Sequence, residues 1–154
     1  MKIFIMRHGE AVQFALSDAE RALTERGQSA SIAVARASNE QGVKQFDLVL
    51  VSPYVRAQQT WNAIAQYFEA DKVETSEDIT PYGDSEQVFD YLQARIDVDS
   101  LESVLIVSHL PLVGYLTAEF VTDITPPMFS TSGLTCIDYD HSAQRGEIVW
   151  SLNP

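Results

Sequence analysis

Residues 2–9 read Lys-Ile-Phe-Ile-Met-Arg-His-Gly, an apolar run that ends in an arginine, a histidine and a glycine. A short run rich in Ile, Phe and Met that stops at a turn residue is typical of a buried strand. The stretches 47–51 and 103–107 have the same character, and the polar pairs Ser52-Pro53 and Ser108-His109 follow them. We therefore predict three buried strands, each ending in residues that can carry chemistry.

Helical segments are predicted between these strands. The four helices are expected from Thr24 as N-cap to about Glu40, from Ser52 as cap with Pro53 in the first turn towards Phe68, after Ser85 through Ile96, and from Pro111 to about Phe120. Residues 134–139 and 147–152 are two further strands joined by a polar turn. We predict a single domain, residues 1–154, with a three-layer α/β/α fold. Its central sheet is mainly parallel and has an antiparallel C-terminal edge.

The composition is that of a soluble globular protein, with 45% hydrophobic residues among 154 and a net charge of −12. This negative charge disfavours nucleic acid and anionic membrane surfaces as partners. No apolar run is long enough to span a bilayer, and the run at 2–6 is too short for a signal peptide. The single cysteine, Cys136, cannot form an internal disulfide, which fits a reducing compartment. We expect a cytoplasmic monomer.

The polar residues at the three strand ends are expected to meet, because ligands of open parallel sheets bind beyond the carboxyl ends of the strands. His8 supplies an imidazole that is a good nucleophile near neutral pH. Arg7 and Arg56 supply planar guanidinium groups that match the oxygens of a phosphoryl group. His109, when protonated, adds positive charge or donates a proton. This set of residues is suited to phosphoryl transfer through a phosphorylated histidine.

Three motifs occupy these strand ends: Arg7-His8-Gly9, Ser-Pro-x-x-Arg-Ala-x-Gln-Thr at 52–60, and the second histidine at 109. Together they resemble the histidine phosphatase superfamily, which includes the cofactor-dependent phosphoglycerate mutases. The stretches 21–24, 108–115 and 126–129 are more narrowly similar to the SixA group of protein phosphohistidine phosphatases. This resemblance, which spans nearly the whole chain, implies a phosphoglycerate mutase-like fold, a nucleophilic His8, a phosphate pocket of Arg7, Arg56 and His109, and no metal or cofactor.

The chain departs from the wider superfamily at one point. Many phosphomonoesterase members carry an acidic proton donor after the third strand, and here Pro81 stands in the donor's place. An alkoxide leaving group needs protonation, whereas the imidazole that leaves phosphohistidine is less demanding. The missing acid therefore favours a P–N substrate, although Asp78, Asp84 or Glu86 remain candidates for a displaced donor.

Three functions follow from these observations. The first is a metal-independent hydrolase that removes phosphate from histidine on a protein through a covalent phospho-His8 intermediate. The resemblance implies a phosphocarrier or a phosphotransfer domain of a signalling system as its partner. The second is a phosphomonoesterase of the same superfamily that acts on a small molecule or a phosphopeptide. The third is a non-catalytic module that recognises phosphorylated partners.

Several other residues have a structural alternative to a functional role. Arg21 either contacts phosphate at the rim of the site, as a substrate-binding residue, or forms a salt bridge with a neighbouring acid. His141 lies in a polar turn and is expected to face solvent. Cys136 lies in an alternating strand pattern and is expected to be a packing residue. The three histidines show no spacing typical of a zinc site.

Overall fold

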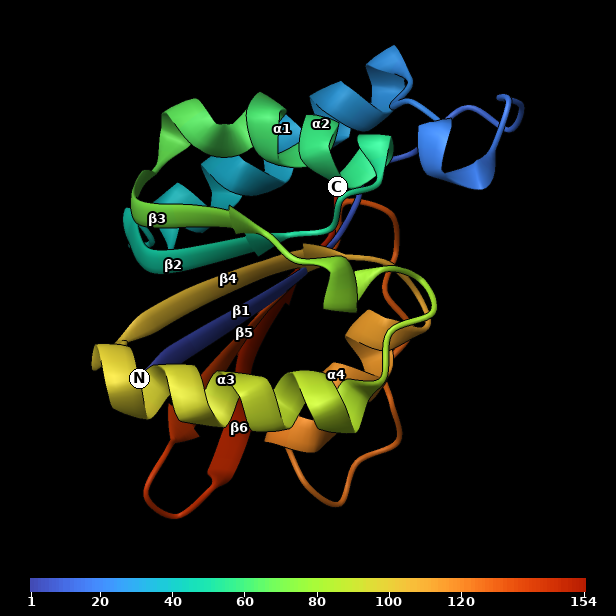
Figure 1. Ribbon diagram of the computed structural model, residues 1–154. Helices are drawn as coiled ribbons and strands as arrows, with labels where there is room; N and C mark the ends of the chain where they lie inside the picture. The colour runs from blue at the N-terminus through green and yellow to red at the C-terminus, as the bar shows by residue number, and fades with distance from the viewer.

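The computed structural model describes residues Met1–Pro154 and contains one six-stranded sheet with the order β3-β2-β4-β1-β5-β6. The strands are β1 Lys2–Arg7, β2 Gln45–Val51, β3 Glu69–Thr75, β4 Ser103–Ser108, β5 Leu134–Asp140 and β6 Arg145–Leu152. The first four strands pair in parallel, whereas β5 is antiparallel to both β1 and β6 (Figure 1). The predicted mainly parallel sheet with an antiparallel C-terminal edge is thus confirmed.

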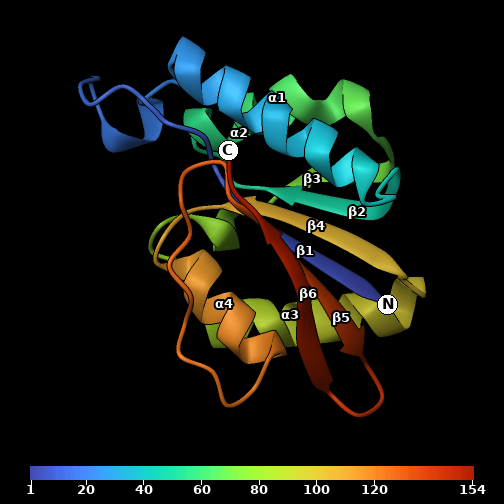
Figure 2. The same ribbon diagram turned by 180° about the vertical axis from the view of Figure 1, so that it is seen from behind.

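Four helices cover the sheet, which makes three layers. They are α1 Glu25–Glu40, α2 Val55–Ile64, α3 Ser85–Asp99 and α4 Leu112–Phe120. Figures 1 and 2 show α1 and α2 on one face of the sheet and α3 and α4 on the other. Three single turns of 3-10 helix, η1 Asp18–Glu20, η2 Ala65–Tyr67 and η3 Glu77–Ile79, complete the elements.

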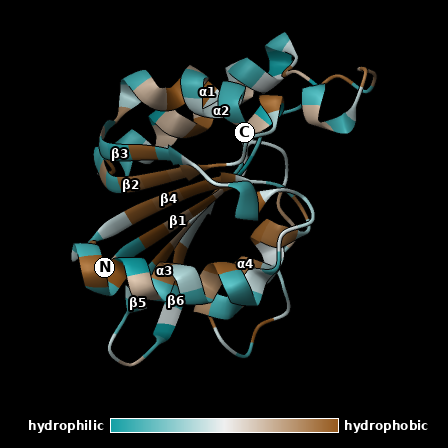
Figure 3. Ribbon diagram, in the orientation of Figure 1, coloured by the Kyte–Doolittle hydropathy of each residue, from teal (hydrophilic) through white to brown (hydrophobic).

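The central strands are apolar throughout because both of their faces are covered. In β1, Ile3 and Ile5 belong to the core under α3 and α4, whereas Phe4 and Met6 belong to the core under α1 and α2. Figure 3 shows this apolar colour concentrated in the middle layer. Since every side chain from position 3 to 6 is buried, the charged residue that follows them, Arg7, marks the place where the strand leaves the core.

The helix boundaries agree with the sequence except at α2. Thr24 is the N-cap of α1, because its Oγ1 accepts a hydrogen bond from the N–H of Gly27 at 2.9 Å. The prediction for α2 was wrong: the helix begins at Val55, after an N-cap residue, Tyr54, that makes no side-chain cap. Pro53 lies in the turn before the helix, and the hydroxyl of Ser52 is used elsewhere, 2.7 Å from His109 Nε2.

Strand β3 has no counterpart among the predicted elements. It lies at the edge of the sheet beside β2, and none of its residues is buried. An edge strand of this kind carries a mixture of charged and small residues and lacks the apolar run by which buried strands are found. None of the helices combines the length and the apolar character that crossing a membrane requires.

Candidate active site

The carboxyl ends of β1, β2 and β4 lie side by side along the border of the sheet where these strands end. We call this border the active-site edge; it is distinct from the outer strands β3 and β6. Arg7 pairs in register with Ser108, and Val51 pairs with Val107. The residues that follow these three strands are therefore neighbours in space, as expected for a parallel sheet. Figure 1 shows the loops after β1 and after α4 on this same side of the molecule, together with the segment that leads into α3. All the predicted site residues are attached to this edge.

His8 is buried and held in one tautomer. Its Nδ1 lies 2.7 Å from the carbonyl oxygen of Gly9, which can only accept, so Nδ1 carries the proton. Its Nε2 accepts a hydrogen bond from Nε–H of Arg56 at 3.2 Å. The Nε2 lone pair therefore points towards Arg56, and the bond from Nδ1 to Gly9 fixes the orientation of the ring.

The turn that carries His8 is built from residues of two other elements. The N–H of Gly9 donates to Thr60 Oγ1 on α2 at 3.0 Å, and Thr60 donates in turn to the carbonyl of Arg56 at 2.7 Å. A Cβ atom at position 9 would lie 2.7 Å from the carbonyl oxygen of Gly27 on α1, closer than real Cβ atoms come. The glycine after His8 thus lets the loop pass against α1, and the last residue of the 52–60 motif holds it in place.

Burial keeps the two histidines of the site neutral. Desolvation, followed by the neighbouring arginines, lowers the pKa of His8 to about 4, although the bond to Gly9 acts in the opposite direction. Desolvation and the nearby His8 and Arg56 lower the pKa of His109 to about 3. Without a bound anion, His109 is therefore not the protonated group that its proposed role requires. A bound phosphoryl dianion would raise both pKa values, because opposite charge favours the protonated form.

The neutral histidines predict a loss of stability in weak acid. The unfolded chain takes up a proton on each histidine near pH 6.5, whereas the folded chain does so only near pH 4 for His8 and near pH 3 for His109. Each lowered pKa therefore contributes stability that is present above pH 6.5 and is lost as the pH falls. We expect the free energy of unfolding to drop by roughly 1–2 kcal/mol per histidine between about pH 7 and about pH 5.

Urea unfolding at the two pH values measures this drop. The matched variant is His8→Asn, which keeps a polar side chain but does not titrate, and its drop should be smaller than that of the wild type. Equal drops in the two proteins would show that His8 is protonated in the folded state already at weakly acidic pH.

Arg56 is buried on the first turn of α2 and bonds Asp18 as well as His8. Its Nη1 donates to the carbonyl oxygen of Asp18 at 2.6 Å, and its Nη2 donates to Asp18 Oδ2 at 3.2 Å. The ring of Tyr54 lies against the same guanidinium, whose Cζ is 5.1 Å from the ring centroid. Asp18 thus connects the loop after β1 to the guanidinium group of Arg56 on α2.

Asp18 is the site residue that sequence reasoning missed. Arg21, together with Arg56, holds the pKa of its carboxyl below the ordinary range, so the group is ionised. No motif marks this residue, since it lies in an irregular stretch of mixed polar and apolar residues between the strand and α1. Its contact with Arg56 spans 38 positions of the chain and depends on the fold.

Arg21 forms a salt bridge with Asp18. Its Nη1 lies 3.0 Å from Asp18 Oδ1, and its Nε donates to the carbonyl of Val12 at 2.7 Å. These bonds favour the salt-bridge alternative and leave its contact with phosphate as a prediction. Arg21 nonetheless lies close enough to lower the pKa of His8.

Arg7 and His109 complete the surroundings of His8. Arg7 Nη1 donates to the carbonyl oxygen of Phe129 at 2.9 Å, and its buried Nε makes no hydrogen bond within the protein. The ring of His109 lies 5.0 Å from that of His8, and its Nδ1 is likewise buried without a partner. The structure thus brings His8, Arg7, Arg56 and His109 together, and Arg7 and His109 each have a buried nitrogen without a hydrogen-bond partner.

None of the three acids considered as a displaced proton donor is bonded into this cluster. Asp84 is the N-cap of α3, since its Oδ1 accepts from the N–H groups of Glu86 and Gln87 at 2.9 and 3.2 Å. Glu86 and Asp78 are exposed and make no side-chain bond to His8 or His109. The carboxylate that is bonded to the guanidinium beside His8 is that of Asp18, which is ionised and bonded to two arginines.

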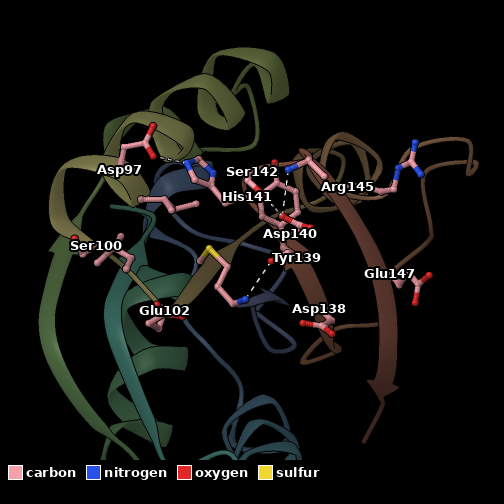
Figure 4. A pocket seen from close by; sticks show the side chains of 14 residues that line it. Asp97, Ser100, Glu102, Asp138, Tyr139, Asp140, His141, Ser142, Arg145 and Glu147 are labelled. Atoms are coloured by element: carbon pink, nitrogen blue, oxygen red, sulfur yellow. Dashed lines mark hydrogen bonds and ion pairs between the residues drawn. The ribbon is translucent and has the colours of Figure 1, made fainter.

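A wide hollow of about 820 Å³ lies at the other end of the sheet, where β1 and β4 begin (Figure 4). Its lining includes the carboxylates of Asp97, Glu102, Asp138, Asp140 and Glu147, which repel a phosphate. The structure has no group of three or more His, Cys, Asp or Glu residues placed to hold a metal ion. The acidic lining makes this hollow a poor site for a phosphate.

The expectation for His141 was wrong, and that for Cys136 is confirmed. His141 is only partly exposed, and its Nε2 lies 2.6 Å from Asp97 on α3. The polar turn between β5 and β6 folds back onto that helix. Cys136 is buried in the core, and desolvation raises the pKa of its thiol to about 11.

Comparisons with known proteins identify the family of the chain. Residues 3–97 match the family model described as histidine phosphatase superfamily (branch 1). The chain is 41% identical to the phosphohistidine phosphatase SixA of Escherichia coli strain K12, over all of this chain and 94% of that protein. It is also 41% identical to a phosphohistidine phosphatase SixA homolog of Haemophilus influenzae, over 97% of this chain and 93% of the relative.

A solved structure shows the same fold at high similarity. The structure of the protein histidine phosphatase SixA complexed with tungstate has a TM-score of 0.93 to this chain and is 41% identical to it. The match covers 100% of this chain and 97% of the other. The similarity therefore extends over every strand and helix around the site.

Proposed function

Because the chain belongs to the histidine phosphatase superfamily, we propose that it is a protein phosphohistidine phosphatase that works through a covalent phospho-His8 intermediate. Two relatives with 41% identity over nearly their full length carry that activity in their names, and the tungstate in the similar structure is an oxyanion like phosphate. His8 is the nucleophile, and Arg7, Arg56 and His109 bind the phosphoryl group.

The observation that carries the proposal is the state of His8. Its Nδ1–H is fixed on the Gly9 carbonyl, the low pKa keeps the ring neutral, and Nε2 is the nitrogen left with a lone pair. That nitrogen lies 3.2 Å from Nε of Arg56, so a phosphoryl group attached to it falls within reach of the guanidinium. A nucleophile and a charged clamp are thus preorganised at one place.

The reaction then has two displacement steps. Nε2 of His8 attacks the phosphorus of the substrate phosphohistidine, whose other ring nitrogen carries a proton. The P–N bond of the substrate breaks, and its electron pair stays on the substrate nitrogen, so that neutral imidazole leaves. A water molecule then attacks the phosphorus of phospho-His8, the bond to Nε2 breaks, and inorganic phosphate leaves while the water proton passes to solvent. The arginines balance the charge on the phosphoryl oxygens in both steps.

The acid–base groups of the site support a P–N substrate. Asp18 is ionised, Asp84 caps α3, and His109 is neutral before substrate binds, so no group stands ready to protonate an alkoxide. A phosphohistidine protonated on its second ring nitrogen releases neutral imidazole, whose conjugate acid has a pKa near 6.5, so its departure needs no acid from the protein. An alkyl phosphomonoester instead releases an alkoxide, which has to be protonated as it leaves.

The proposed substrate is phosphohistidine on a phosphotransfer domain or a small phosphocarrier protein. The open edge of the sheet can admit a residue displayed on another folded protein. We further propose a single-domain monomer acting in the cytoplasm, in keeping with its one buried, unpaired cysteine.

A comparison of two substrates tests the function. A phosphotransfer domain phosphorylated on histidine should be dephosphorylated rapidly, whereas an alkyl phosphate such as phosphoserine should be hydrolysed at least about 100-fold more slowly, because its alkoxide leaving group lacks an acid catalyst. Faster hydrolysis of the monoester would move the function to small phosphoesters. Tight phosphate binding without turnover of either substrate would indicate a recognition module.

A further inference from the structure

The four most exposed large hydrophobic side chains of the chain all lie in loops at the active-site edge. They are Leu16 at 98%, Phe14 at 88%, Tyr82 at 84% and Met128 at 83% exposed. Phe14 and Leu16 follow β1, Tyr82 precedes α3, and Met128 follows α4. In Figures 1 and 2 these three loops project on the same side of the molecule. We call these four residues the apolar rim.

Phe14 and Leu16 are held near His8 by the contacts of their own loop. The base of the loop is closed by a bridge between Ala11 and Leu23, and Asp18 ties its far part to Arg56. Since consecutive Cα atoms are about 3.8 Å apart, the Cα of Leu16 lies within about 8 Å of that of Asp18. The two most exposed apolar side chains are therefore anchored to a guanidinium that bonds the reacting nitrogen.

Met128 and Tyr82 are tied to the site from the other side. Met128 precedes Phe129, whose carbonyl accepts a hydrogen bond from Arg7 at 2.9 Å. Tyr82 follows η3, and the carbonyl of Ile79 in η3 accepts from Ser108, the residue before His109, at 2.7 Å. The loops that carry the apolar rim thus each bond to a catalytic residue or to its neighbour in sequence.

We propose that the apolar rim is the docking surface for the protein that carries the phosphohistidine. This inference rests on the proposed function. His8 and His109 are buried, so a phosphohistidine can reach them only if the surface around it comes into contact with the rim. Exposed aromatic and aliphatic side chains around a reactive pocket are the anchors that dominate the energetics of protein interfaces.

The charges beside the rim define the partner's chemistry. Glu77, Asp78, Asp84 and Glu86 lie within five residues of Tyr82, and Glu20 lies on the loop of Leu16. An acidic surface next to the phosphohistidine would be repelled, and an apolar one with basic residues at its border would be attracted. The partner is therefore a folded protein whose phosphohistidine stands among exposed apolar side chains.

Two substrates that share the P–N bond separate docking from chemistry. The variant is Phe14→Ser/Leu16→Ser, and the substrates are a phosphotransfer domain phosphorylated on histidine and free phosphoimidazole. We expect kcat/KM on the phosphoprotein to fall at least about tenfold, mainly through KM, because two apolar anchors are lost. The rate on phosphoimidazole should stay within about twofold of wild type, because it makes no contact with the rim.

The matched control is Val98→Ser. Val98 is 79% exposed on α3, whose C-terminal end lies at the opposite edge of the sheet, and its replacement should leave both rates unchanged. An unchanged phosphoprotein rate in the double variant would overturn the docking proposal. Equal losses on both substrates would also overturn it, because they indicate that the loop shapes the pocket.

Two more outcomes are decisive. Sedimentation that shows a wild-type dimer and a monomeric double variant would assign the rim to a second copy of the chain and overturn docking of the substrate. Failure of the wild-type protein on both phosphohistidine substrates would refute the proposed function itself. Turnover by wild type with no effect of the double variant refutes only the docking surface.

Discussion

The His8→Ala variant is expected to form no phosphoenzyme and to lose at least about 10⁴-fold in kcat on phosphohistidine. In the proposed mechanism Nε2 of His8 accepts the phosphoryl group, and the bond from Nδ1 to Gly9 sets the ring tautomer that leaves Nε2 unprotonated. Intact-protein mass spectrometry of rapidly quenched wild type should show the mass of one added phosphoryl group. The same sample of the variant should show none.

Folding of the variant is checked separately. His8 lies at the end of β1 and its backbone bonds remain possible with alanine, since its N–H donates to Ser108 and its carbonyl accepts from Ser132. Thermal unfolding and circular dichroism should therefore show a folded protein. Turnover by a folded His8→Ala protein would exclude the covalent mechanism.

The Arg56→Ala variant is expected to lose at least about 10²–10³-fold in kcat/KM. Arg56 is the buried guanidinium nearest to the reacting nitrogen, and it also anchors Asp18 and with it the loop after β1. Arg56→Lys keeps a positive charge but loses the planar fork, so it should recover only part of the rate. Steady-state rates with phosphohistidine protein measure both variants.

Arg95→Ala is the matched control for loss of a well-bonded arginine. Arg95 on α3 pairs with Glu74 at 2.9 Å and with Asp99 at 2.7 Å, far from His8 in the fold. Its removal should lower the thermal midpoint and leave kcat/KM unchanged. An Arg56→Ala protein with the rate of Arg95→Ala would show that the site does not use this guanidinium.

The buried strands and the residues that follow them could be predicted because burial on both faces leaves an unmistakable apolar run. The run at 2–6 ends where the core ends, so Arg7 and His8 emerge at the sheet edge by necessity. The same reasoning fails for β3, which is an edge strand with exposed charges and resembles a loop in sequence. It also fails for Ser52, whose position before a proline is typical of a helix cap, because His109 competes for its hydroxyl.

Asp18 and the partly buried His141 were missed for a different reason. Both owe their environment to long-range contacts, with Arg56 in one case and with Asp97 in the other. Such contacts depend on how a polar loop folds back onto a helix, and polar loops carry little periodic information. The proximity of His8, Arg56 and His109 was predictable from motifs at strand ends, but the fold of the loop after β1 was not.

The ionised Asp18 also bears on how the enzyme ends each cycle. In the proposed cycle, hydrolysis leaves inorganic phosphate in the pocket. Arginines without a carboxylate bonded to them would hold this product tightly, and the enzyme would be inhibited by it. A phosphoryl group that binds the same Nη2 of Arg56 has to displace the carboxylate of Asp18, so this carboxylate lowers the affinity of the pocket for every phosphate complex by the same factor. We therefore expect weak inhibition by inorganic phosphate. A phosphohistidine on a protein can recover the lost affinity through the contacts that its own protein makes.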